Sequence, residues 1–299
     1  MIYYLVFGYI ILFLFLRHLG RDFDKPLYWI TLISLFIFSS LRYEVGCDWD
    51  TYEIIFDLFS FDQSDGSLGI RNAFLTGEFL YLGSIGAIKY LGLPYETLNI
   101  ITGLIFFLGI HSLAQRQPNP LLFLVLSFPI LIINMPMAGI RQAAAIGFLC
   151  FGFIAFIEKK TIRYLLFVFL AAMFHSSAII FILPSIFLFL DLNRRTFILM
   201  IALLTAFVLI ILSSQAAQFA IERYLEEEID SSGAIFRVGL VAATGIFFLL
   251  ILNKQWKVLY AHDHHFIKLF SIGMIMIFPL LLISTVISDR IGYYLMPAQ

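Results

Sequence analysis

The sequence predicts an all-α, polytopic integral membrane protein. Of its 299 residues, 61% are hydrophobic and 13% are charged, whereas an average soluble domain is about 45–50% apolar and about 25% charged. The mean hydropathy of +0.96 agrees with this bias. A chain of this composition cannot present a wetted surface on all sides, so we expect membrane-embedded helices that satisfy their own backbone hydrogen bonds.

Apolar runs separated by polar loops mark the expected helices. They cover 1–16, 26–41, 79–93, 97–113, 121–135, 137–157, 162–190, 196–213, 234–252 and 266–287. A spanning helix needs about 20 residues, so 162–190 is too long for one span and is predicted to turn at His175. The runs 79–93 and 121–135 are short, and one of them is expected not to span. Together they predict about nine to eleven transmembrane or re-entrant helices in a single domain, 1–299.

The basic residues predict how the chain is oriented. Lysine and arginine fall in short loops that are expected in the cytoplasm: Arg17, Arg21 and Lys25; Lys159, Lys160 and Arg163; Arg194 and Arg195; Lys254, Lys257 and Lys268. The N-terminus and the loops 42–78 and 214–233 are then external, the latter an amphipathic or simply solvated acidic helix. The histidines of 262–265 are expected in a cytoplasmic loop. The last residues begin another segment, so we expect a truncated C-terminus.

Several polar side chains gather on the predicted external side. They are Arg42, Asp48, Glu78, Arg141, His175, Arg237 and Arg290. Ionisable groups near membrane depth cost roughly 2.5–3.5 kcal/mol to insert, so they are candidate functional residues. Four arginines on the face that normally lacks basic residues indicate that an anion is held there.

Arg141 and Gln142 follow Pro136 at the start of a helix rich in small residues. A helix N-terminus favours phosphate, and a guanidinium can grip its oxygens in pairs. The competing interpretation is an arginine that snorkels to the interface. His175 is suited to general acid–base work, or it caps a helix start together with Ser176.

Other candidates carry weaker signals. Arg290 is a candidate ligand-binding residue unless Asp289 pairs with it, and Arg237 is also explained by snorkelling. Asp48 and Asp50 alone are a weak metal signal, and Glu78 is also a favourable acid at a helix start. The formal net charge of −1 and the lack of a basic tract argue against electrostatic binding of nucleic acid, so no nucleic-acid partner is expected. No nucleotide, hydrolase or metal-cluster motif is present, so no cofactor is expected.

The order of these motifs resembles the EpsG-like Wzy family of polysaccharide polymerases over residues 42–290. The matching features are Arg42, Gly46-x-Asp48 and Tyr52, Glu78, Arg141-Gln142, Phe174-His175-Ser176 and Asp289-Arg290. The resemblance implies an inverting, metal-independent glycosyltransferase of GT-C-like architecture in the bacterial cytoplasmic membrane. Its implied partners are donor and acceptor glycans on undecaprenyl diphosphate at the periplasmic face, the lipid bilayer, and a chain-length regulator protein.

This resemblance assigns roles to the candidates. Arg141 and Arg290 would bind the leaving diphosphate, assisted by Arg42 or Arg237, with Gln142 and Tyr52 in support. His175 or Asp48 would deprotonate the acceptor hydroxyl, and Glu78 would orient a sugar or hold an arginine. Two alternatives stay open. One is a transporter or flippase of a lipid-linked anionic glycan, although no internal repeat is evident. The other is a transferase of the O-antigen-ligase type, which differs only in its acceptor.

Overall fold

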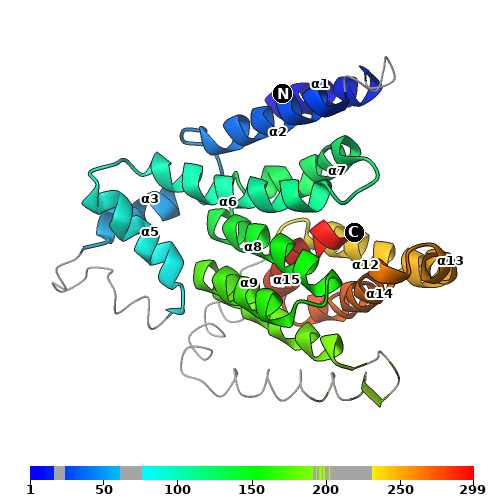
Figure 1. Cartoon of the computed structure of the whole chain (residues 1–299). Helices are drawn as coiled ribbons and strands as arrows, with labels where there is room; N and C mark the ends of the chain where they lie inside the picture. The colour runs from blue at the N-terminus through cyan, green and yellow to red at the C-terminus, as the bar shows by residue number, and fades with distance from the viewer. Residues whose placement is uncertain are drawn as a thin grey trace. The chain divides into compact units, whose positions relative to one another are not determined.

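The computed structural model describes residues 1–16, 24–60, 76–190 and 231–299, with a few single positions between 193 and 202. Every regular element in these ranges is a helix, which confirms the predicted all-α class (Figure 1). Almost all of the predicted run 196–213 and of the predicted surface helix 214–233 lies outside the described residues. So do residues 61–75 of the loop 42–78.

The chain forms two compact units. Unit 1 comprises 1–151 and 169–176, and unit 2 comprises 152–168 and 177–299. Unit 1 contains α1 (Ile2–Leu16), α2 (Asp24–Ser40), α3 (Trp49–Leu58), α5 (Phe79–Tyr90), α6 (Glu96–Ala114), α7 (Pro120–Ser127) with the π-helical turn η3 (Phe128–Ile132), most of α8 (Ile140–Ile157) and the end of α9 (Thr161–Phe174). The prediction of a single domain stays a prediction.

Unit 2 contains the end of α8, the start of α9 and the remaining helices. These are nearly all of the 3-10 helix η4 (Ser176–Leu188), α12 (Ala234–Phe247) with η6 (Phe248–Leu252), α13 (Asn253–Leu259), α14 (Ala261–Met276), η7 (Pro279–Leu282), α15 (Thr285–Leu295) and η8 (Met296–Ala298). Within this unit α12 packs against both α14 and α15.

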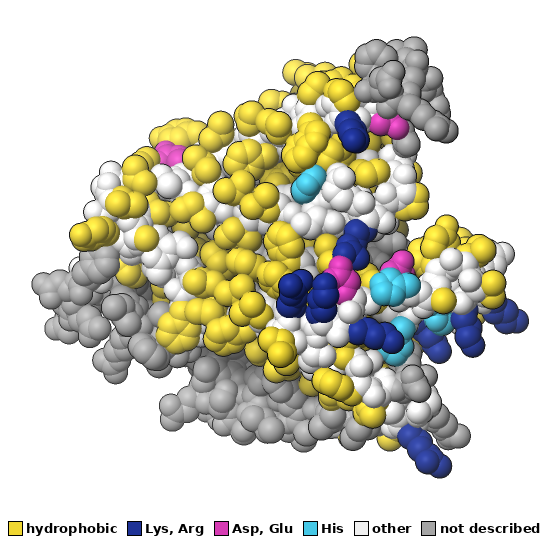
Figure 2. Space-filling view, in the orientation of Figure 1, with side chains coloured by type: hydrophobic (Ala, Val, Ile, Leu, Met, Phe, Trp, Pro, Cys, Tyr) yellow, Lys and Arg dark blue, Asp and Glu magenta, His cyan; other side chains and the backbone are white. Residues whose placement is uncertain are grey.

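Four helical stretches in the described residues are long and apolar enough to cross a membrane. They are Glu96–Ala114, Ile140–Ile157, Ala234–Leu259 and Ala261–Leu282. The first has 19 residues, or about 28 Å at 1.5 Å per residue, close to the roughly 30 Å thickness of a hydrocarbon core. Apolar side chains cover much of the face seen in Figure 2. The prediction of a polytopic membrane protein is therefore confirmed.

Two of the predicted runs, 162–190 and 266–287, each divide into more than one helix. The run 162–190 divides into α9 and η4 on either side of His175, as predicted. The run 266–287 is not one helix, because Pro279 opens a short 3-10 turn and Ser284 then caps α15. The expectation that 262–265 form a loop was wrong, since these residues lie in the first turns of α14.

Close helix packing in unit 1 sets the position of α8. A Cβ atom at Gly109 of α6 would lie 2.1 Å from the backbone oxygen of Gly147, and one at Gly147 would lie 2.4 Å from the oxygen of Ile105. The helix backbones therefore touch, which only glycine permits. Ala143 and Ala144 are fully buried nearby. The small residues of α8 thus fix the helix that carries Arg141.

Candidate active site

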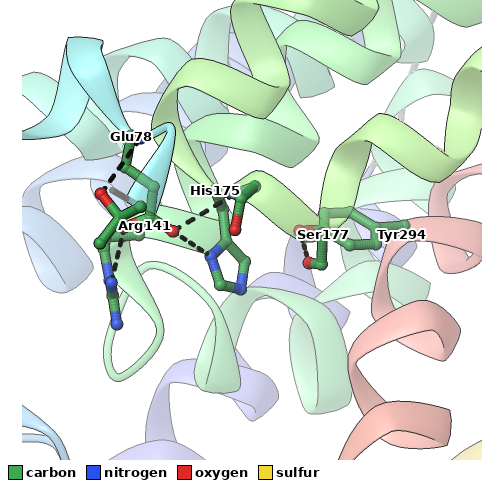
Figure 3. Close-up of polar contacts among 7 residues, drawn as sticks. Glu78, Arg141, His175, Ser177 and Tyr294 are labelled. Atoms are coloured by element: carbon green, nitrogen blue, oxygen red, sulfur yellow. Dashed lines mark hydrogen bonds and ion pairs between the residues drawn. The ribbon is translucent and has the colours of Figure 1, made fainter. Parts of the chain in front are cut away.

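Glu78 is the centre of a charged network in unit 1. It precedes α5 and is only 4% exposed. Its Oε2 accepts a hydrogen bond from Nη1 of Arg141 at 2.7 Å. Its Oε1 lies 2.9 Å from Nδ1 of His175 and accepts from the backbone N–H of Ser176 at 3.3 Å. One carboxylate therefore joins the start of α8 to the break between α9 and η4 (Figure 3).

The electrostatics of this network keep Glu78 ionised. Burial alone would raise the pKa of the Glu78 carboxyl group. The hydrogen bond with His175 and the positive charge of Arg141 outweigh burial and lower that pKa to about 2. A carboxylate of such low basicity is a poor proton acceptor at neutral pH. Glu78 is therefore suited to holding its two neighbours, which was one of the two roles expected from the sequence.

The contact with Glu78 also orients the imidazole of His175. An ionised carboxylate only accepts hydrogen bonds, so the Nδ1 that faces it carries the proton. In the neutral ring the lone pair then belongs to Nε2. Such a histidine can accept a proton at Nε2, and the carboxylate behind it stabilises the imidazolium that forms. The geometry thus fixes which edge of the imidazole faces Glu78.

Aromatic rings enclose Arg141, whose side chain is 28% exposed. Its guanidinium carbon lies 5.4 Å from the ring centroid of Tyr52 and 5.3 Å from that of Tyr81. Arg141 Nε and the Tyr81 hydroxyl are buried, and neither has a hydrogen-bond partner in the described chain. Sequence reasoning named Tyr52 and missed Tyr81. The spacing Glu78-x-x-Tyr81 could have identified it, because residues three apart share a helix face.

The other candidate residues of unit 1 differ in their exposure and in their hydrogen bonds. Gln142 is buried beside Arg141 in α8. Asp48 is exposed at the start of α3, and no hydrogen bond in the described residues links its side chain to Glu78 or His175. Arg42 is buried and donates hydrogen bonds to three backbone carbonyls and one amide oxygen. The diphosphate contact expected of Arg42 would require it to give up these bonds.

Unit 2 contains an ion pair between two of the predicted polar residues, Arg237 and Asp289. Arg237 donates from Nε to Oδ1 of Asp289 at 2.8 Å and from Nη2 to Oδ2 at 2.6 Å. The hydroxyl of Ser231 donates to the same Oδ2 at 2.7 Å. Asp289, considered as a partner for Arg290, therefore holds Arg237 in a two-pronged contact. Arg290 is half-buried in α15. The diphosphate-binding roles of Arg237 and Arg290 stay predictions.

A metal site in the described ranges would need clustered ligand side chains, and a disulfide there would need two paired cysteines. No group of three histidine, cysteine, aspartate or glutamate side chains there could hold a metal ion. Cys47 is exposed and Cys150 is buried, and both thiols are free. The groups gathered around Glu78 are a guanidinium, an imidazole and two phenols.

Comparison with known proteins identifies the family. No curated protein and no solved structure gives a significant match. The EpsG family model matches residues 25–299, nearly the whole chain, and the match includes Glu78, Arg141 and His175. EpsG proteins are Wzy-like polysaccharide polymerases, whose activity is that of a glycosyltransferase-like polymerase in a membrane. The sequence, its all-α membrane fold and this match together show that the chain belongs to the EpsG family.

Proposed function

We propose that the protein joins glycan repeat units carried on undecaprenyl diphosphate, by an inverting and metal-independent transfer at the periplasmic face of the cytoplasmic membrane. The observation that supports this proposal best is the network at Glu78. One oxygen of the buried Glu78 carboxylate binds the guanidinium of Arg141, which is suited to a diphosphate. The other oxygen binds the imidazole of His175, which is suited to a hydroxyl. A glycosyl transfer from a lipid diphosphate needs both groups.

The proposed step is a direct displacement. A hydroxyl of the acceptor's non-reducing sugar attacks the anomeric carbon of the donor glycan. The new glycosidic C–O bond forms as the bond from that carbon to the phosphate oxygen breaks. The lipid diphosphate leaves with the electron pair, and the hydroxyl proton passes to Nε2 of His175. Attack on the face opposite the leaving group inverts the anomeric configuration.

Arg141 supplies the positive charge for the leaving group in this proposal. Its Nη1 is held by Glu78, while its Nε has no hydrogen-bond partner in the described chain. Guanidinium donors form short, charge-assisted bonds to phosphate oxygens, and these strengthen as negative charge develops. The position of Arg141 in the first turn of α8 adds the favourable field of a helix N-terminus. A fixed guanidinium can thus do the work that a divalent cation does in other transferases.

Membership of a polymerase family favours this reaction over transport of the same lipid-linked glycan. An O-antigen-ligase-type transferase would use the same donor and differ in its acceptor. The two reactions give different products. Repeated transfer between lipid-linked repeats produces a ladder of lengths, whereas transfer to another acceptor releases carrier diphosphate and gives no ladder.

The test is extension of a lipid-diphosphate-linked repeat by purified protein in liposomes containing EDTA. We expect a glycan ladder from the wild type and none from Arg141→Ala or His175→Ala, at equal levels of membrane-inserted protein. Arg116→Ala is the matched control, because Arg116 is exposed beyond the far end of α6. Long glycan made by Arg141→Ala would refute the diphosphate assignment. Activity that requires an added divalent cation would refute metal independence.

A further inference from the structure

Arg42 is a buried cation whose hydrogen bonds all go to neutral oxygens. It lies just beyond α2 and is 6% exposed. Its Nε donates to the carbonyl of Val45 at 2.8 Å, and Nη1 donates to the carbonyls of Ser39 at 2.9 Å and Pro136 at 2.7 Å. Its Nη2 donates to Oδ1 of Asn99 at 3.2 Å. Every nitrogen of the guanidinium is therefore engaged inside unit 1.

These contacts reach the segment that leads into α8. Pro136 is 94 residues from Arg42 in sequence. The backbone of Gly46 packs closely against Met137, the residue after Pro136. A Cβ atom at position 46 would lie 2.0 Å from the carbonyl oxygen of Met137. The φ angle of Gly46 is +115°, which side chains rarely tolerate. Residues 42–46, which we call the α8 brace, thus contact two consecutive backbone carbonyls, one through a hydrogen bond from Arg42 and the other through close packing of Gly46.

Backbone hydrogen bonds constrain the short segment between the braced carbonyls and Arg141. The backbone N–H groups of Ala138 and Gly139 both donate to the carbonyl of Asn134, which closes a tight turn. The N–H of Ala143 then donates to the carbonyl of Gly139, as in the first turn of a helix. A rotation of α8 by only 10° would move a guanidinium that lies about 6 Å from the helix axis by about 1 Å. Misplacement of that size can cost about 100-fold in rate.

We propose that Arg42 is a positioning residue, which acts through the brace to hold Arg141 in register with Glu78 and the donor diphosphate. This inference rests on the proposed function of Arg141. It replaces a direct contact between Arg42 and the diphosphate, because the donors of Arg42 are already bound to protein oxygens. It also gives Gly46 a role, since the brace cannot approach Met137 with a side chain at that position.

The test is a double-mutant cycle on lipid diphosphate binding. The probe is undecaprenyl diphosphate without glycan, bound to the purified full chain in detergent. Arg42→Lys keeps the charge, but one ammonium cannot replace a fork that reaches three carbonyls. We expect Arg42→Lys to weaken binding about tenfold and Arg141→Ala to weaken it at least as much. The double variant should bind like Arg141→Ala alone, because Arg42 acts only through Arg141.

Two controls separate positioning from general stability. Leu32→Ala removes buried volume from α2, far along the helix from the brace, and should lower the melting temperature without changing affinity. Asn99→Ala removes one of the four contacts and should weaken binding a few-fold, again only when Arg141 is present. This milder variant keeps the test valid should Arg42→Lys fail to fold.

The outcomes are distinct. Equal weakening by Arg42→Lys with and without Arg141 would mean that Arg42 binds the ligand independently, and would overturn the inference. Lower melting temperature with unchanged affinity would also overturn it, leaving Arg42 a structural residue only. Unchanged binding by Arg141→Ala would instead refute the proposed function of Arg141, on which the inference depends.

Discussion

Replacing Glu78 by glutamine removes one buried negative charge and almost no volume. The variant keeps an oxygen that can accept from Arg141 or His175, but it leaves the Arg141 cation without its counterion. The neutral amide also cannot stabilise an imidazolium at His175 as a carboxylate does. We therefore expect Glu78→Gln to lower both the stability of unit 1 and the rate of polymerisation.

The size of the stability loss follows from the protonation equilibrium. The pKa of Glu78 falls from 4.5 to about 2 in the folded protein, which corresponds to about 3 kcal/mol in favour of the charged form. Breaking a buried ion pair typically costs about 3–5 kcal/mol. The side chain of Arg141 is 28% exposed, so water recovers part of this cost and about 2–3 kcal/mol is expected.

The direction in which stability changes with pH tests whether the ionised Glu78 carboxylate is the source of the stabilisation. The carboxylate has a lower pKa folded than unfolded, so its stabilisation is fully present above pH 4.5 and is lost as pH falls towards 2. The difference in melting temperature between wild type and Glu78→Gln in detergent should be largest at pH 7 and should shrink below pH 4.5. A difference that is zero at pH 7, or constant from pH 7 to pH 2, would refute the reasoning. Ladder formation should fall roughly 100-fold or more.

Three further substitutions test the surroundings of this network. Gly46→Ala should destabilise the protein and reduce chain extension, because its Cβ would lie 2.0 Å from the Met137 oxygen; unchanged melting temperature would contradict this. Gly147→Ala should cost about 1–3 kcal/mol by forcing α6 and α8 apart, whereas Gly83→Ala, with open space around its Cβ, should be neutral in thermal unfolding. Tyr81→Phe removes a buried hydroxyl that has no hydrogen-bond partner among the described residues, so stability should be kept. The initial extension rate should nevertheless fall, and an unchanged rate would exclude a role for that hydroxyl.

The sequence predicted the helices better than their exact ends. An apolar run marks a helix whether its side chains face lipid or other helices, so α6, α8 and α12 begin within a few residues of the predicted runs. The polar residues around His175 predicted the break between α9 and η4. Polar side chains in the middle of an uninterrupted membrane helix are costly, so they indicate that the helix ends there. An apolar run does not show where the helix within it is interrupted. The 3-10 turn at Pro279, within the run 266–287, was therefore not predicted.

Pairing between charges was harder to predict than their presence. An arginine in an apolar chain signals a partner, but not whether that partner is a phosphate, a carboxylate or a carbonyl. Arg42 donates hydrogen bonds to backbone carbonyls, one of which lies 94 residues away in the sequence. The residues next to Arg42 in the sequence do not indicate that contact. Likewise, Asp289 and Arg290 are neighbours in sequence but point about 100° apart on α15. The structure places Arg237, 52 residues away, on the carboxylate of Asp289.

The position of Glu78 between Arg141 and His175 explains how one small network can serve both ends of a glycosyl transfer. During the proposed step, negative charge grows on the leaving diphosphate while positive charge grows on the imidazole. Arg141 faces the first and the Glu78 carboxylate faces the second, so each developing charge meets an opposite one. Because a single carboxylate orients both groups, the two cannot be independent. Arg141→Lys and His175→Gln combined should therefore cost less than the product of their separate effects on the extension rate, since either change already disturbs the carboxylate that the other needs.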